Sequence, residues 1–215
     1  MKRLRILKIF LVTFVIALTG LTAINTLLQI HAPYDQYFAL FTLGSGGKTE
    51  HYFPGEKYDI YQGTHMSWFV GVYNHMGTVQ LVKVVFKLLN STIEGPDQLH
   101  NTPSNRTSFY EATRLLLSNE TWMLPVDWSV LNATQTANVT AIHILLFNNE
   151  TLSENVEVDA IHGYNFRMVI ELWPYDQTTG NFTFGWEVDG QERSAWNQIW
   201  KHDERITSSN LESLT

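Results

Sequence analysis

Apolar residues follow two different patterns along this chain. Residues 9–30 form one run of 22 uncharged residues, most of them apolar. From residue 37 onward, apolar residues occur instead in short segments, several of which alternate with polar positions and are bounded by Gly, Pro or Asn. The first pattern predicts a helix of about 33 Å, which is long enough to cross a bilayer. The second pattern is typical of half-buried β-strands.

Eight segments are predicted to be extended. They are residues 37–43, 66–74, 79–89, 121–130, 139–147, 164–173, 182–188 and 194–200. The alternation that marks a half-buried strand is clearest in two of them. The apolar face of one is formed by Val82, Val84, Phe86 and Leu88, and that of the other by Phe182, Phe184, Trp186 and Val188.

Turns and a long loop separate these strands. The polar stretch 90–119 contains Gly95-Pro96 and Thr102-Pro103 and predicts a loop, within which residues 111–117 fit either a short helix or another strand. Seven or eight strands joined by turns predict a mainly β fold, an immunoglobulin-like antiparallel β-sandwich preceded by a single N-terminal transmembrane helix.

The charges around the apolar run predict its orientation. Four basic residues, Lys2, Arg3, Arg5 and Lys8, precede it, and the first acidic residue after it is Asp35. By the positive-inside rule, only the N-terminal end lies in the cytoplasm. The predicted order is a cytoplasmic basic stub 1–8, an anchor 9–30, a linker 31–36, an extracellular β-sandwich domain 37–200 and a polar tail 201–215. The alternative is a signal peptide cleaved after Ala23, although Leu21 is large for the position two residues earlier.

Composition limits the classes of partner and chemistry. The chain has no Cys, which excludes disulfides, thiolate metal sites and a cysteine nucleophile. Its net charge is −7, and beyond the four N-terminal cations 10 basic residues face 21 acidic ones, a balance of −11. An acidic domain would repel phosphate, so nucleic acid is not an expected partner. The expected partner is the lipid bilayer, through the apolar run 9–30.

Potential N-glycosylation sites are more frequent than chance predicts. The pattern Asn-x-Ser/Thr occurs seven times, where chance would give about two or three matches. The excess is typical of a glycan-bearing surface protein. The alternative is a Thr- and Asn-rich β protein with accidental matches. The acceptor residues are Asn90, Asn105, Asn119, Asn132, Asn138, Asn149 and Asn181.

The segment 37–90 carries a recognisable series of motifs. One strand ends in Leu-Gly and leads into Gly-Lys, an aromatic-Pro-Gly segment follows, and a second strand ends in Gly-Val-Tyr-Asn-His-Met-Gly. This order resembles the domain-of-unknown-function family numbered 1616, which occurs mostly in archaeal membrane proteins. The resemblance implies an extracytoplasmic β-sandwich next to the membrane and no particular reaction. Met76 stands where the family usually has an acidic residue, and the matching residues are Leu43, Gly44, Gly47, Lys48, Gly71, Asn74, His75 and Gly77.

Catalytic patterns are weak, so no catalytic residue, metal ligand or cofactor is expected. Gly47-Lys48-Thr49 imitates the end of a P-loop, but Thr42 stands where its first glycine belongs, and turn chemistry explains the segment better. No nucleophile elbow of the G-x-S-x-G type is present. The eight His form no metal-binding motif; a metal site would need distant residues such as His51, His65 and His75.

These observations favour a binding or structural role over an enzyme. The leading hypothesis is a membrane-anchored, glycosylated domain that contacts another membrane or surface-layer protein of the cell envelope. The first alternative is a carbohydrate-binding module that uses exposed Trp and Tyr, with Trp196 and Trp200 as candidates for its surface. A weaker alternative is an extracellular metal-dependent enzyme.

The predicted topology gives a first test. The protein is expected to sediment with membranes, to require detergent for release, and to be digested when protease is added to whole cells, because only eight residues are predicted to lie inside. Cell fractionation and immunoblotting with a cytosolic marker check this. Recovery in the cytosol, or survival under external protease, would contradict the predicted orientation.

Overall fold

The computed structural model describes residues 35–56, 60–161, 166–200 and 206–207, together with Phe14 and Thr19. Contacts divide the chain into two units, residues 1–35 and 36–215. Except for Phe14 and Thr19, the predicted anchor 9–30 lies outside the described residues. No helix within the described ranges is long and apolar enough to span a membrane. The anchor therefore stays a prediction, and all of the described strands belong to the second unit.

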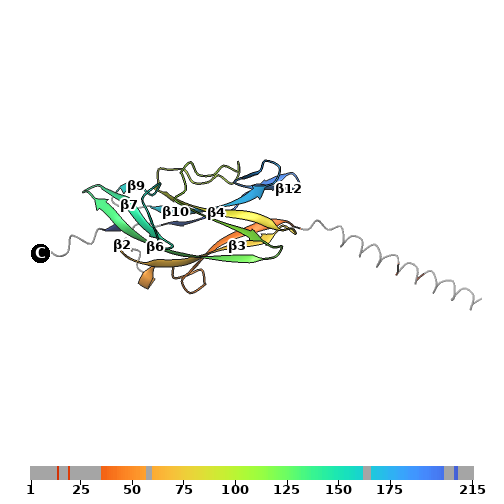
Figure 1. Ribbon diagram of the computed structural model, residues 1–215, viewed down its shortest axis with the longest axis horizontal. Coiled ribbons are helices and arrows are strands. Elements are labelled where there is room, and N and C mark those ends of the chain that lie inside the picture. Colours follow the sequence, from red (N-terminus) through yellow and green to blue (C-terminus); the bar gives the residue numbers. More distant parts are fainter. Residues whose placement is uncertain are drawn as a thin grey trace, which may run out of the picture. The chain divides into compact units, whose positions relative to one another are not determined.

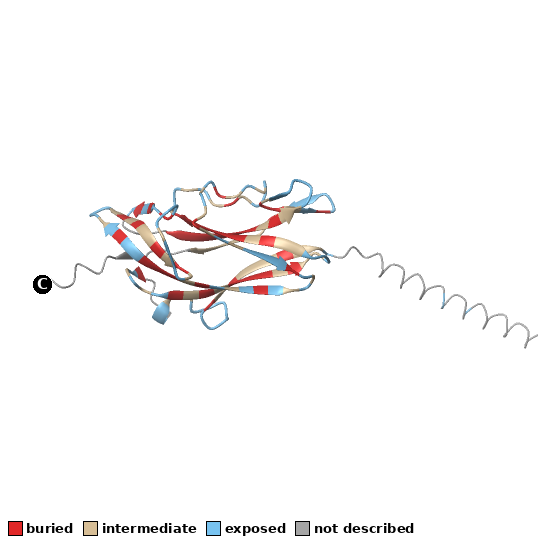
Figure 2. Cartoon of the chain, in the orientation of Figure 1, coloured by how far each residue is buried: buried red, intermediate tan, exposed pale blue. Residues whose placement is uncertain are grey.

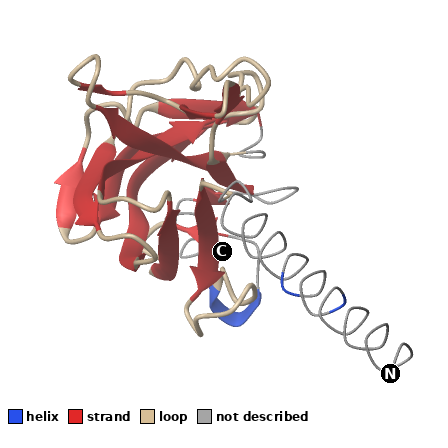
Figure 3. Ribbon diagram, turned by 90° about the vertical axis from the view of Figure 1, so that its right-hand side faces the viewer, coloured by secondary structure: helices blue, strands red, loops and turns tan. Residues whose placement is uncertain are grey.

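The described part of this unit is built almost entirely from strands. Its elements are β1 (Tyr37–Gly44), the short 3-10 helix η1 (Pro54–Glu56), β2 (Ile60–Tyr61), β3 (Met66–His75), β4 (Gln80–Leu89), β5 (Tyr110–Leu116), β6 (Thr121–Gln135), β7 (Val139–Phe147), β8 (Glu150–Leu152), β9 (Val158–Ile161), β10 (Arg167–Asp176), β11 (Asn181–Phe182), β12 (Trp186–Val188), β13 (Gln191–Arg193), β14 (Trp196–Trp200) and β15 (Ile206–Thr207). Figure 3 shows how the strands dominate.

Most strands belong to two antiparallel sheets, which form separate layers in Figure 1. The first sheet has the order β1-β3-β6-β7-β8, and β9 also pairs with β7. The second has the order β11-β10-β4-β5, and β14 also pairs with β10. Two small pairs complete the described sheets, antiparallel β12–β13 and parallel β15–β2. The predicted mainly β, antiparallel fold is confirmed in this sandwich-like arrangement.

The core lies between the two sheets, where buried positions face each other (Figure 2). The predicted apolar face of β4 is fully buried: Val82, Val84, Phe86 and Leu88. Aromatic rings connect the layers, because Phe86 of β4 lies 5.0 Å from Phe147 of β7 between ring centroids. Trp68 of β3 and Trp128 of β6 pack edge to face at 5.2 Å. Such pairs stabilise the core beyond the area they bury.

Residues 182–188 do not form the single strand that their alternation predicts. The chain makes two short strands there, β11 and β12. Gly185 lies between them with a φ of 97°, a backbone conformation that interrupts an extended strand. Phe184 and Val188 are buried as predicted, whereas Phe182 and Trp186 are half-buried.

The stretch 90–119 is part strand and part covering loop. Residues 110–116 form β5 and pair with β4, so the segment that fitted either a helix or a strand is a strand. Residues 90–109 run along the outer side of the second sheet, as the olive loop in Figure 1 shows. This loop buries a sheet face that would otherwise contact solvent.

Asn74, one of the family-motif residues, is a fully buried amide that joins two turns. Its Nδ2 donates to the carbonyls of Thr78, Leu116 and Leu117, at 2.9, 3.2 and 3.0 Å. Its Oδ1 accepts from the Met76 N–H at 3.0 Å. A buried polar group is tolerated when its hydrogen bonds are made, so the role of Asn74 in this structure is to hold the β3–β4 and β5–β6 turns together.

Asparagine supplies most of the left-handed backbone outside glycine among the described residues. Seven non-glycine residues have positive φ, and five of them are Asn: Asn101, Asn119, Asn148, Asn149 and Asn155. Asn148 and Asn149 form the two-residue turn between β7 and β8, with φ of 46° and 67°. Hairpin turns of this length favour positive φ at both positions, and Asn adopts it more readily than most residues.

Two motif glycines allow close contacts around β1. At Gly71, a Cβ would lie 2.1 Å from the ring of Phe41, its cross-strand partner, so the ring covers the glycine. At Gly44, a Cβ would lie 1.9 Å from the carbonyl oxygen of Glu50. The turn after β1 is closed by hydrogen bonds from Gly44 N to Lys48 O and from Gly47 N to Gly44 O.

Substitution of Gly44 tests this turn. Gly44→Ala is expected to lower the free energy of unfolding by about 1–3 kcal/mol, because the new methyl group meets backbone rather than a movable side chain. Gly46→Ala, in the same turn, meets nothing within 4 Å and should change stability by less than about 0.5 kcal/mol. Urea unfolding of both variants measures the difference. Equal effects would show that the close approach does not matter.

Candidate functional site

The outer face of the second sheet carries charged groups that are buried. Lys87 on β4 and Glu171 on β10 point away from the core, yet they are 4% and 0% exposed. The loop 90–109 covers them from outside. A charge this deep requires a partner and hydrogen bonds, because removal from water costs several kcal/mol per ion.

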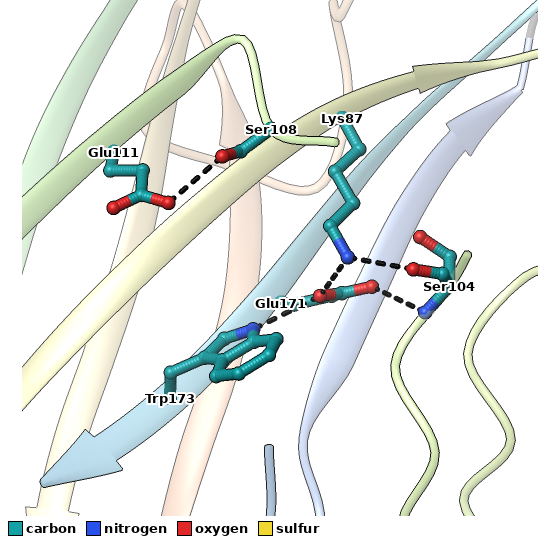
Figure 4. A network of polar contacts seen from close by, with 6 residues as sticks. All are labelled: Lys87, Ser104, Ser108, Glu111, Glu171 and Trp173. Carbon is teal, nitrogen blue, oxygen red and sulfur yellow. Dashed lines mark hydrogen bonds and ion pairs between the residues drawn. The ribbon is translucent and has the colours of Figure 1, made fainter. Parts of the chain in front are cut away.

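Lys87 and Glu171 form an ion pair that meets this requirement (Figure 4). Lys87 Nζ lies 2.8 Å from Glu171 Oε2 and donates to the Ser104 carbonyl at 2.9 Å. Glu171 also accepts from the Ser104 N–H at 2.9 Å and from the Trp173 indole N–H at 3.0 Å. Both ions therefore bind the backbone of Ser104, which fixes the later part of the loop to the sheet.

Arg167 holds the first part of the same loop. It lies on β10 and is 8% exposed. Its guanidinium donates to the carbonyl of Asn90 at 3.2 Å and to the carbonyl of Ile93. Burial lowers the pKa of Arg167 from its ordinary value, which is high enough for the group to stay charged. The loop is thus attached to β10 at two separate points: Arg167 binds its first residues, and Glu171 binds Ser104.

Beside the buried pair lies an open cleft of about 410 Å³. Strands β4 and β5, the end of the loop and the β10–β11 hairpin supply its walls. Its lining combines two aromatic rings with a set of charged and neutral hydrogen-bonding groups. The lining residues are Lys83, Val85, Lys87, Arg106, Thr107, Ser108, Glu111, Trp173, Asn181 and Phe182.

One wall of the cleft is a polar network around Glu111. Lys83 Nζ donates to Glu111 Oε2 at 2.9 Å. Ser108 Oγ donates to Glu111 Oε1 at 2.8 Å, as Figure 4 shows. Partial burial acts to raise the pKa of Glu111, but the hydrogen bonds from Lys83 and Ser108 outweigh it, so the pKa is below its usual value. Lys83 also lies 4.7 Å from the centroid of the Phe182 ring. At neutral pH Glu111 is therefore an ionised acceptor facing the cleft.

Arg106 makes the cleft locally positive. Its guanidinium donates to the backbone carbonyls of Asn155 and Glu157, and it forms no ion pair with a carboxylate among the described residues. Its Nε is buried without a described acceptor. The lining thus holds three cations and one carboxylate, with Glu171 below. This donor-rich set suits binding of a polar molecule, and it contains no His, Asp or Cys.

The structure places six of the seven predicted glycan acceptors at exposed positions. These are Asn105, Asn119, Asn132, Asn138, Asn149 and Asn181. Asn90 is half-buried, and its amide nitrogen donates to the Asp159 carbonyl at 2.8 Å. Asn181 is both an acceptor and a lining residue of the cleft, and Asn105 precedes the lining residue Arg106.

The two tryptophans that the sequence suggests for binding lie on β14, in the same sheet as the cleft, and Trp196 is not one of its lining residues. Trp196 is half-buried on β14 and pairs with Glu171 across the strands. Trp200 pairs with Arg167, and its side chain lies outside the described set. The cleft instead uses Trp173 and Phe182. The sequence contains a signal for this face, because Lys83, Lys87 and Glu171 interrupt otherwise apolar strands at alternate positions.

The three histidines considered as metal ligands do not meet. His51 and His65 line a second cleft of about 590 Å³ near η1. His75 is elsewhere, with its Nδ1 2.9 Å from Asn119 Oδ1 and 3.1 Å from the Tyr73 hydroxyl. Within the described ranges, no three side chains of His, Cys, Asp or Glu come close enough to hold a metal ion.

No model of a known protein family matches the chain, and no curated protein sequence matches it. The resemblance over residues 37–90 therefore stays a prediction. The structure gives its motif residues physical roles, because Gly44 and Gly71 permit close contacts and Asn74 joins two turns. None of these motif residues lines the cleft.

Lys87 and Lys83 offer a matched comparison on one strand. Lys87→Met is expected to lower the free energy of unfolding by about 3–5 kcal/mol, because Glu171 would be left buried without its cation. Lys83→Met breaks a partly exposed pair and should cost less than about 1 kcal/mol. Chemical unfolding measures both. Similar small losses would show that the buried pair does not fix the loop.

Proposed function

We propose that this chain is a carbohydrate-binding module of the cell envelope and that the cleft beside the Lys87–Glu171 pair is its site. The observation that carries the proposal is the pairing of two half-buried rings, Trp173 and Phe182, with ionised and neutral hydrogen-bonding groups in one open cleft. The sequence alone favours contact with an envelope protein and places carbohydrate second. The composition of the cleft reverses that order.

The chemistry of sugars supports this choice. A pyranose has an apolar face of C–H groups, which packs on aromatic rings, and a rim of hydroxyls, which donate and accept hydrogen bonds. The cleft offers rings for the face, and Glu111, Ser108 and Asn181 for the rim. Its open form leaves room for a chain of sugars to continue beyond the site. Its positive balance favours saccharides that carry carboxylate or sulfate groups.

The cellular setting belongs to the same proposal. The apolar run 9–30 would hold the domain outside the cytoplasm, next to the membrane, where envelope saccharides are found. The seven acceptor sequences and the expected immunoglobulin-like sandwich fit such a surface module. A fixed tether raises the local concentration of the domain near its ligand, so a weak site can suffice.

A second candidate function is contact with an envelope protein through β5. Among the described residues, β5 pairs with β4 only, so its other edge is open. Leu115 and Leu117, on and just after this strand, are 58% and 60% exposed. An open edge with exposed apolar side chains is a site where a partner can add a β-strand. The edge carries neither Pro nor Lys, the residues that commonly block such pairing.

Binding to a saccharide array distinguishes the two functions. Protein made without glycosylation is expected to bind at least one neutral or acidic oligosaccharide, and Phe182→Ala should weaken that binding about tenfold or more because one stacking surface is lost. Isothermal titration measures the change. Phe182→Ala keeps the buried pair intact, since Phe182 does not contact Glu171 in the polar network.

The matched control is the double variant Leu115→Lys and Leu117→Lys. It should bind saccharide like the original protein, because neither residue lines the cleft. In intact membranes, the same variant should lose a crosslinked protein partner if β5 is the functional surface. Absence of saccharide binding together with loss of that crosslink would replace the first proposal with the second.

A further inference from the structure

Asn181 brings a predicted glycan acceptor to the wall of the cleft. It is exposed, it lines the cleft together with the neighbouring Phe182, and Thr183 completes its acceptor sequence. We propose that the cleft's first occupant is the glycan attached to Asn181 of the same chain, and that this glycan regulates access of other saccharides. This inference rests on the proposed function, because it assigns a regulator to that site.

The attachment point is held firmly. The strand β11 pairs with the end of β10, with Phe182 opposite Tyr175 and Asn181 opposite Asp176. The loop between them is closed by Asp176, which accepts from the Thr178 N–H at 2.8 Å and the Thr179 hydroxyl at 2.9 Å. The amide nitrogen of Asn181 donates to the Thr179 carbonyl at 3.0 Å. A sugar on this nitrogen would start at a fixed place beside the cleft.

Proximity then decides which saccharide occupies the site. A group on a short tether reaches an effective concentration in the millimolar range. If the site binds a free sugar with a dissociation constant of about 1 mM, a tethered copy at about 10 mM would fill it about nine-tenths of the time and weaken external binding about tenfold. Weak recognition, which suits an open cleft, is therefore enough for self-occupancy.

Other acceptor positions lack this relation to the cleft. Asn132 is exposed on β6 of the first sheet and is not a lining residue. A glycan there would leave the cleft open. Thr134→Ala, which removes the acceptor sequence of Asn132, is therefore the matched control for Thr183→Ala, because each removes one glycan without changing a lining residue.

The experiment compares four forms of the full chain: the original protein made without glycosylation, the glycosylated protein, and the variants Thr183→Ala and Thr134→Ala made under glycosylating conditions; Thr183→Ala removes the acceptor sequence of Asn181 and keeps Asn181 itself in the cleft wall. Mass spectrometry of glycopeptides establishes occupancy at Asn181. The probe is the free oligosaccharide released from the glycosylated protein, with affinity measured by titration. The unglycosylated form and Thr183→Ala are expected to bind the probe about tenfold more tightly than the glycosylated protein and Thr134→Ala.

Three results would overturn the inference, and they are distinguishable from failure of the proposed function. An unmodified Asn181 in the glycosylated protein would remove the occupant. Equal affinity of the glycosylated protein and Thr183→Ala would show that the glycan does not enter the cleft, while the proposed function would stand. Failure of the unglycosylated protein to bind this probe would overturn the inference alone if it still binds the saccharide array, and would overturn both if it binds neither. Hydrogen exchange at residues 104–111, slower with the glycan than in Thr183→Ala, provides a second measure of occupancy.

Discussion

The carboxylate of Glu171 is the constraint on which the outer side of the second sheet depends. It is fully buried, so it requires both a cation and hydrogen-bond donors. Lys87, Ser104 and Trp173 provide them. Because Ser104 belongs to the loop 90–109 and Trp173 to the cleft, one ionised group determines where the loop lies and how a ring of the proposed site is oriented. The loop is held to the sheet at Ser104, and its residues 106–108, which follow directly, form one wall of the cleft.

Much of the fold could be predicted from local patterns. The segments 37–43, 66–74, 79–89 and 139–147 are strands within a residue of the expected bounds, because alternating burial and flanking turns leave a direct trace in the sequence. The interrupted strand at 182–188 could not be predicted, since Gly185 takes a conformation that only the surrounding structure requires. The cleft could not be predicted for a related reason. Its residues come from β4, β5, β10, β11 and the covering loop, and their meeting depends on strand order.

The second sheet carries both of the surfaces that are candidates for binding. The second sheet is covered by a loop for much of its length, and its exposed part is the cleft. Along the same sheet, β5 presents an open edge with apolar side chains, while β14 lies near β1 and connects the layers through Asn197 and Thr42, 2.9 Å apart. On the side of β14 and β1, the two sheets are thus connected to each other, whereas the side of β5 is available for contact with another molecule. The proposed cleft and the β5 edge both lie on the available part.

The asparagines with positive φ have a consequence for work on surface sugars. Asn119 and Asn149 are potential acceptors, and both also hold the backbone in the left-handed region, at φ of 62° and 67°. Turn geometry therefore accounts for their identity whether or not a sugar is attached. Replacing either one changes the backbone energetics together with the modification. The clean way to abolish modification at these positions is to alter the third residue of each acceptor sequence, Thr121 or Thr151, which are exposed strand residues.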